Sequence, residues 1–135
     1  MCFKRIKEII NPLKPAGTID IHMASSILLD KLEEIGDDKA EIYLPDTNFK
    51  IYRKDDVAKF LSLDKVDEII YVAEEQDCDD SAAEMFGKGL SLIWTYYHAF
   101  NWFIDTDNIL WFVEPQNDKI SQELSCSDVR FYLGR

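Results

Sequence analysis

The sequence predicts one small α+β domain. Its 135 residues suffice for a single core, and 47% of them are hydrophobic and 13% aromatic, which is typical of a folded chain rather than a disordered one. Helical spacing of apolar residues predominates in the N-terminal half, whereas aromatic, β-favouring segments follow a helix in the C-terminal half. These observations predict N-terminal helices, then a helix followed by an antiparallel β-hairpin or sheet.

The first residues form a unit of their own in this prediction. Apolar residues recur at helical spacing from Phe3 to Ile10 among lysine and arginine residues, which predicts an amphipathic helix. Residues 11–17 carry two prolines and a glycine, so they are predicted to be a linker. We therefore expect an N-terminal helix and linker over residues 1–16 and a single domain over residues 17–135. The helix either packs on the domain or docks on a membrane surface or a partner.

The next elements are short. Residues 24–35 place Ile27, Leu28, Leu32 and Ile35 on one stripe and end at Gly36, which predicts a helix with a glycine stop. Four further segments are predicted before residue 75: extended pieces at 40–44 and 49–52 around a turn at 45–48, and helices at 54–62 and 65–74.

Most of the functional signal lies after residue 77. Residues 78–86 predict a helix with an aspartate-rich first turn, ended by Gly87 and Gly89. The β-favouring run from 90 to 105, the polar group at 105–108 and the apolar run 109–113 predict strand, tight turn and strand. Residues 117–135 predict no clear element beyond an apolar fragment at 129–133.

Charge and cysteine content exclude several classes of protein. A formal charge of −11 argues against binding nucleic acid through its phosphates. No signal peptide is visible, and no apolar stretch approaches the roughly 20 residues that cross a bilayer. Three cysteines at unrelated spacings, with no CxxC pair, predict neither disulfides nor a zinc ribbon. We expect a cytoplasmic protein without a cofactor or metal.

Three residues form a candidate catalytic site. A thiol at a helix N-terminus, here Cys78, is stabilised as a thiolate by free backbone N–H groups. His98 on a following strand could take its proton, and Glu114 on the next strand could orient the imidazole. A hairpin loop at 105–107 would pair His98 with Glu114. A loop at 106–108, with Asn108 left-handed, would leave Glu114 diagonal to His98 on the same sheet face, whereas a two-residue loop would separate them.

These residues also carry a resemblance. The runs around Cys78 (QDCDDSA), His98 (HAFN) and Glu114 (FVEP) resemble the transglutaminase-like superfamily of papain-fold proteins, and the chain is similar to small uncharacterised phage-encoded and archaeal proteins. The resemblance covers residues 70–120. It implies a papain-like minimal core with Cys78 as nucleophile, His98 as base and Glu114 as orienting acid. Glu114 stands where aspartate is usual, and the interval from Cys78 to His98 is short.

The implied function is a thiol-dependent acyl-transfer enzyme that hydrolyses or transamidates a peptide, isopeptide or amide bond in a protein or peptide substrate. Trp94, Asn101 and Gln116 are the candidate substrate-binding residues. Trp94, Trp102 and Trp111 could line a groove for a peptide or a sugar, although aromatics at strand spacing are more often core residues. The same resemblance is compatible with a catalytically inactive papain-like domain that binds proteins, in a phage or host-interaction setting.

The sequence is also compatible with roles that involve no catalysis. The N-terminal helix could mediate homo-oligomerisation of a structural protein. His22 and His98 could hold a metal together. Cys78, His98 and Glu114 could also be ordinary core or strand-end residues, because free cysteine is among the most buried residue types.

Overall fold

A computed structural model describes residues 13–37, 39–64, 78–124 and 128–135. The predicted N-terminal helix and the predicted helix at 65–74 lie outside these residues. Within them the chain forms three helices and eight strands. In chain order they are β1 (Gly17–Asp20), α2 (Ile21–Ile35), β2 (Glu41–Tyr43), β3 (Asn48–Ile51), α3 (Lys54–Leu63), α4 (Cys78–Lys88), β4 (Ser91–Thr95), β5 (Ala99–Ile104), β6 (Leu110–Glu114), β7 (Lys119–Ser121) and β8 (Val129–Leu133).

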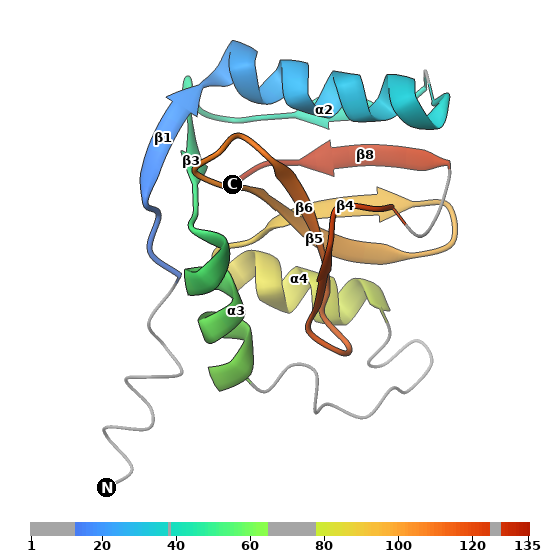
Figure 1. The fold of residues 1–135 in the computed structure, drawn as a ribbon. Coiled ribbons are helices and arrows are strands. Elements are labelled where there is room, and N and C mark those ends of the chain that lie inside the picture. The colour runs from blue at the N-terminus through green and yellow to red at the C-terminus, as the bar shows by residue number, and fades with distance from the viewer. Residues whose placement is uncertain (1–12, 38, 65–77, 125–127) are drawn as a thin grey trace, which may run out of the picture.

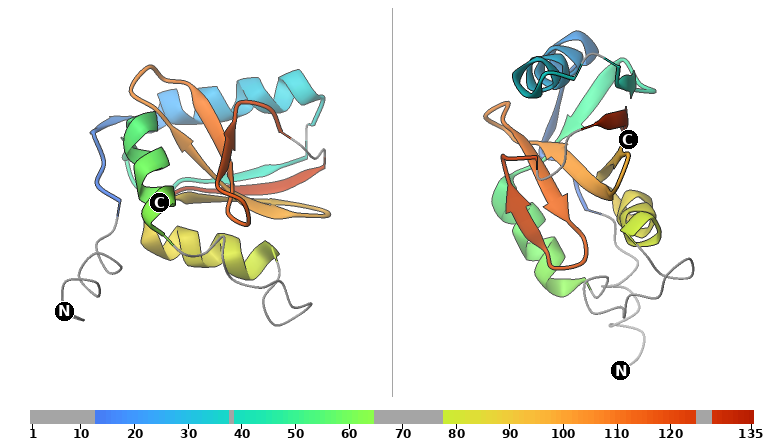
Figure 2. Two further views of the ribbon diagram at one scale, coloured as in Figure 1. Left: turned by 60° about the horizontal axis from the view of Figure 1, so that its bottom comes forward. Right: turned by 90° about the vertical axis from the view of Figure 1, so that its right-hand side faces the viewer.

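A six-stranded mixed sheet organises the molecule. Its order is β2-β8-β4-β5-β6-β7, and β2 and β8 are its parallel pair. α2 covers one face of the sheet and α4 the other, as Figures 1 and 2 show. β1 and β3 form a separate antiparallel ribbon. The six-stranded sheet therefore lies between two helices, and β1 and β3 form a second, two-stranded sheet.

Several local predictions are confirmed. α2 ends at Gly36, whose φ of 74° is left-handed and whose N–H donates to Glu33. α2 begins three residues earlier than predicted, at Ile21, because Asp20 caps its start by accepting from the N–H of His22. α4 begins at Cys78 but continues through Gly87, so Gly89, with a φ of 135°, is the glycine that follows its end.

The predicted continuous run from 90 to 105 is wrong. The chain turns at residues 96–98, so β4 and β5 form an antiparallel hairpin with Ile93 opposite Phe100. No glycine, proline or asparagine marks this turn in the sequence. Hydrogen bonds from the Thr95 side chain close it instead.

The core occupies both faces of the sheet. On the α2 face, Trp102 is fully buried and stacks on Phe49 at 5.2 Å between ring centroids. On the α4 face, Ala82 of α4 packs with Leu92 and Ala99. Every residue of β5 is buried, which makes it the central strand of the hydrophobic core.

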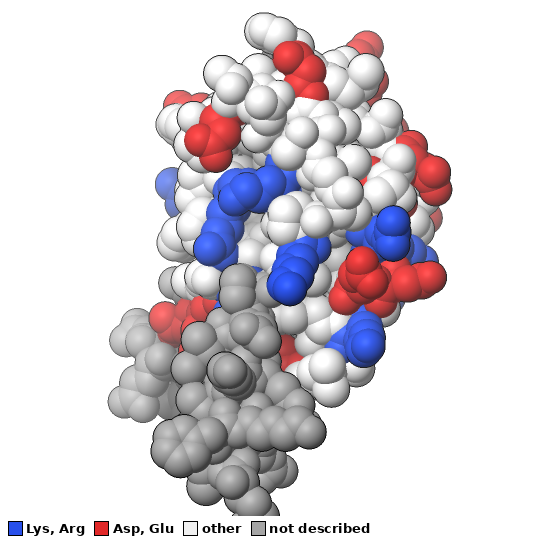
Figure 3. All heavy atoms as spheres, turned by 90° about the vertical axis from the view of Figure 1, so that its left-hand side faces the viewer, with Lys and Arg blue, Asp and Glu red and all other residues white. Residues whose placement is uncertain are grey.

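Charge is unevenly spread over the surface. Despite the net charge of −11, lysine and arginine side chains gather in the middle of the face that holds β1, β3 and α3, while acidic side chains lie around them (Figure 3). Local charge at a site therefore cannot be read from the net charge.

The structure corrects the predicted fold class. The predicted papain-like minimal core consisted of N-terminal helices and a helix followed by an antiparallel β-hairpin or sheet. The described chain is dominated by strands, because both β2 and the C-terminal segment β8 enter the sheet beside β4.

Candidate functional site

Hydrogen bonds between Thr95 and His98 stabilise the turn between β4 and β5. The N–H of Thr95 donates to the His98 carbonyl at 2.8 Å. The Thr95 hydroxyl accepts from the N–H of His98 and donates to the His98 carbonyl, both at 2.9 Å. Outside the turn, the N–H of Tyr96 donates to the carbonyl of Asp128 at 3.0 Å. The turn is therefore anchored both to its own strand and to the start of β8.

Two tyrosines at this turn face solvent. The exposed fractions of Tyr96 and Tyr97 are 67% and 76%. Their rings meet edge to face with centroids 4.8 Å apart. Each ring has an apolar face and a polar hydroxyl, so the exposed pair offers an amphipathic surface that can cover a ligand.

The tyrosines border an open groove of about 480 Å³. A second hollow of about 340 Å³ adjoins it, because Lys39 and Arg130 line both. We call the two together the tyrosine groove. It is lined by Asp37, Lys39, Glu41, Trp94, Tyr96, Tyr97, Asp128, Val129, Arg130 and Phe131.

A separate contact joins His98 to Glu114. Asn101 lies opposite Val113 in the β5–β6 pair, and Asn108 has a left-handed φ of 61°. Of the loop alternatives that the sequence left open, this is the one at 106–108, which places Glu114 diagonal to His98 on one face. His98 Nε2 and Glu114 Oε2 are hydrogen-bonded, and the imidazole stacks on Phe100 with centroids 5.3 Å apart.

The third predicted catalytic residue is placed only by its backbone. Cys78 is the first residue of α4, and its side chain lies outside the description. α4 runs in the same direction as β5 (Figure 1), and Ala82, early in α4, belongs to the core cluster of Ala99, whereas Met85, later in α4, belongs to that of Phe103. The N-terminal end of α4 and the turn at residues 96–98 therefore lie toward the same end of the sheet.

The predicted substrate-binding residues separate into three environments. Trp94 lines the tyrosine groove. Asn101 is fully buried, and its amide donates to the carbonyls of Ala82 and Ser91 at 2.9 and 3.1 Å. The side chain joins α4 to β4 inside the protein, and its contact with a substrate stays a prediction. Gln116 is partly exposed, and its N–H donates to Glu114 at 3.3 Å.

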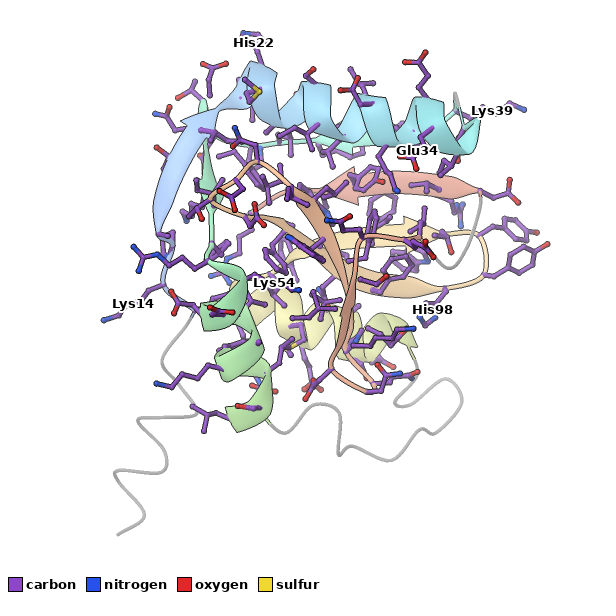
Figure 4. All side chains as sticks on the ribbon, viewed as in Figure 1. Lys14, His22, Glu34, Lys39, Lys54 and His98 are labelled. Atoms are coloured by element: carbon purple, nitrogen blue, oxygen red, sulfur yellow. The ribbon has the colours of Figure 1, made fainter. Side chains whose placement is uncertain are left out.

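The structure does not form the two-histidine metal site. His22 projects outward from α2, whereas His98 lies on the opposite side of the sheet region (Figure 4). Across the described ranges, no group of three or more histidine, cysteine, aspartate or glutamate side chains is placed to hold a metal.

Comparison with solved structures identifies similar folds. The chain superposes on the Polyporus squamosus lectin bound to the human-type influenza-binding epitope Neu5Acα2-6Galβ1-4GlcNAc with a TM-score of 0.69 and 20% identity, over 86% of this chain and 49% of that one. It superposes on the PSL1a–E64 complex with a TM-score of 0.61 and 23% identity, over 70% of this chain and 42% of that one. The chain spans less than half the length of either neighbour. No family model matches, and neither does any curated protein.

These comparisons overturn the predicted family. The comparisons do not support the transglutaminase-like, papain-like assignment, because no family model matches and the structures on which the chain superposes are about half of a lectin chain and less than half of the PSL1a chain. The predicted thiol-dependent acyl-transfer function, the predicted inactive protein-binding domain and the peptide substrate lose their support with it. Within the described residues, no helix is long and apolar enough to span a membrane.

Sequence reasoning missed Tyr96, Tyr97, Lys39 and Arg130. The adjacent tyrosines were included in a predicted strand, where alternate side chains would be buried. Tyr96, Tyr97 and His98 are not residue types that are typical of a tight turn. The two cations come from segments far apart in sequence, so only the pairing of β8 with β2 and β4 brings them beside the turn.

Proposed function

We propose that this chain binds a glycan in the tyrosine groove. The observation that carries the proposal is the exposed pair Tyr96 and Tyr97 at the edge of a groove that also holds charged side chains. The likeness to the Polyporus squamosus lectin supports it at the level of the fold.

The chemistry of the groove suits a sugar. A pyranose ring has an apolar C–H face and a rim of hydroxyl groups. An aromatic ring can cover the apolar face, while carboxylates accept and cations donate hydrogen bonds at the rim. Binding sites usually combine apolar and aromatic walls with a few polar groups that fix orientation. Tyr97, Trp94 and Arg130 supply both kinds of surface.

The position of the tyrosines adds a second physical argument. Their turn is closed by Thr95 and tied to Asp128, so the rings are presented from an anchored backbone. A preorganised aromatic surface loses little conformational entropy when a ligand binds. The groove is therefore suited to recognition by stacking rather than by closure around the ligand.

Binding of an oligosaccharide array to the full chain, followed by calorimetry, tests the proposal. We expect Tyr97→Ala to weaken binding by roughly ninefold, since a ring that covers on the order of 50 Å² of sugar contributes about 1.3 kcal/mol. Leu63→Ala is the matched control, because Leu63 is an exposed apolar side chain on α3, away from the groove. Absence of glycan binding, or equal losses for both variants, would contradict the proposal.

The roles of Cys78, His98 and Glu114 remain a separate proposal. We propose that His98, hydrogen-bonded to Glu114, makes Cys78 a reactive thiolate. The His98–Glu114 contact and the place of Cys78 at the start of α4 support this. The proposal concerns the reactivity of the thiol and assigns no substrate to it.

A further inference from the structure

The sheet face on the α4 side is covered over only part of its width. α4 packs mainly against β4 and β5, while β8 and β2 continue the same sheet beyond β4. Within the described ranges, no helix lies over this outer part of the face, as the right-hand view of Figure 2 shows. Side chains that point to this side from β8 and β2 therefore meet solvent next to α4.

Aromatic side chains occupy the uncovered part. Phe131 of β8 lies opposite Trp94 of β4, and its ring centroid is 5.6 Å from that of Trp94 and 6.4 Å from that of Tyr43 in β2. Leu133 extends the same face of β8. Tyr43 is 50% exposed, and the other three are half-buried. We call these four residues the aromatic shelf. A contiguous apolar surface of this kind is typical of a binding site.

The aromatic shelf is continuous with the tyrosine groove. Trp94 and Phe131 line the smaller hollow of the groove, and Val129 lines the larger one. Arg130 lines both hollows and is the extra residue of a β-bulge, because Val129 pairs with Thr95 while Phe131 pairs with Trp94. A ligand that fills the groove therefore reaches an apolar surface beyond Arg130.

We infer that the glycan bound in the tyrosine groove carries an alkyl aglycone, which lies on the aromatic shelf. This inference rests on the proposed function. Neighbouring strands lie about 4.8 Å apart, so a surface that crosses three strands is about 10 Å long, which suits an extended chain. An alkyl chain needs no hydrogen-bond partner, and its contribution depends on the apolar area removed from water. The contact is therefore independent of the charge of the sugar.

The tilt of the rings favours a chain over another ring on the shelf. The planes of Trp94 and Phe131 meet at 55°, and those of Phe131 and Tyr43 at 73°. The three rings therefore form ridges rather than one flat face on which a sugar or an aryl group could stack. The Tyr43 hydroxyl donates to Glu41, which holds the outermost ring in place at the edge of the sheet.

Titration calorimetry on the full chain tests the inference. The probes are the methyl, phenyl and octyl glycosides of the oligosaccharide that binds most tightly in the array, each below its critical micelle concentration. We expect the octyl glycoside to bind at least about tenfold more tightly than the methyl glycoside. Tenfold corresponds to about 1.4 kcal/mol, which about two buried methylene groups supply. The phenyl glycoside should gain less, because one ring reaches only part of the shelf.

Variants at the outer end of the shelf locate the contact. Tyr43→Ala should reduce the octyl advantage by about threefold and leave methyl glycoside binding unchanged, since Tyr43 does not line the groove. Tyr43→Phe keeps the ring and should retain the advantage. Leu29→Ala is the matched control, because Leu29 is an exposed apolar residue of α2, on the opposite side of the sheet.

The outcomes separate the inference from the function on which it rests. Equal affinity for methyl and octyl glycosides, with loss of both in Tyr97→Ala, would overturn the inference and leave glycan binding in place. An octyl advantage that survives Tyr43→Ala, or that the phenyl glycoside matches, would also overturn it. Absence of binding to all three glycosides would overturn both proposals. Thermal melting of each variant distinguishes these results from loss of the fold.

Discussion

Thr95 and His98 close the turn that carries the exposed tyrosines. The buried Thr95 hydroxyl bonds both the N–H and the carbonyl of His98 at 2.9 Å. Tyr96 and Tyr97 lie between these two residues on the solvent side, and the His98 imidazole is directed to Glu114. One threonine side chain therefore positions both the groove and the His98–Glu114 pair.

Thr95→Val should disturb both regions at once. The substitution keeps the shape of the side chain but leaves the His98 N–H without its partner, which costs about 1–3 kcal/mol. We expect the melting temperature to fall by several degrees, since about 1 kcal/mol corresponds to roughly 2–8 °C, and glycan binding to weaken. Thr95→Ser keeps the hydroxyl and should retain binding. Equal effects of the two substitutions would show that the methyl group, and not the hydroxyl, holds the turn.

Cys78 should be the most reactive thiol of the chain. If His98 and Glu114 support its thiolate, iodoacetamide at pH 6 should label Cys78 faster than Cys2 or Cys126, measured by peptide mass spectrometry. His98→Ala should slow the labelling, and Glu114→Gln should slow it less because the imidazole remains. Cys78→Ser, measured by thermal melting, should leave stability nearly unchanged. Indistinguishable rates at the three cysteines would refute the proposed reactivity.

Tyr132→Phe should stabilise the protein. Tyr132 is fully buried in β8, and its hydroxyl has no hydrogen-bond partner among the residues described. An unsatisfied buried polar group costs about 1–3 kcal/mol, and phenylalanine removes it while keeping the edge-to-face contact with Trp102. Urea denaturation should show a higher midpoint. A lower midpoint would mean that the hydroxyl has a partner that stabilises the fold.

Alkaline conditions should destabilise the fold through Tyr52. Burial raises the pKa of Tyr52, and the Arg135 charge opposes this in part. Since the folded pKa exceeds the unfolded value of about 10, the contribution to stability is fully present below pH 10 and is lost as pH rises above it. The urea midpoint should therefore fall above pH 10, and Tyr52→Phe should reduce the fall. Tyr97→Phe, which removes the hydroxyl of an exposed tyrosine, should leave the fall in the urea midpoint unchanged. An equal response of the two variants would contradict the role given to Tyr52.

Local sequence determined several elements of this protein. The apolar stripe that ends at Gly36 predicted α2, because helical periodicity and a left-handed stop are properties of neighbouring residues. The sequence left three hairpin loops open, and the structure has the one at 106–108 with Asn108 left-handed, which keeps Glu114 and His98 on one face because turn geometry sets the pairing of the strands it joins. Cys78 at the start of α4 was predicted on the same local grounds.

Tertiary structure alone decided the sheet and the groove. β8 lies between β2 and β4, and its sequence carried no sign of these partners because strand pairing depends on residues far along the chain. The turn at residues 96–98 depends on a buried threonine hydroxyl instead of a turn-forming residue. Arg130 and Lys39 meet the tyrosines only once β8 has paired on both sides. Periodicity reports which face of a segment is buried, whereas the site depends on which segments become neighbours.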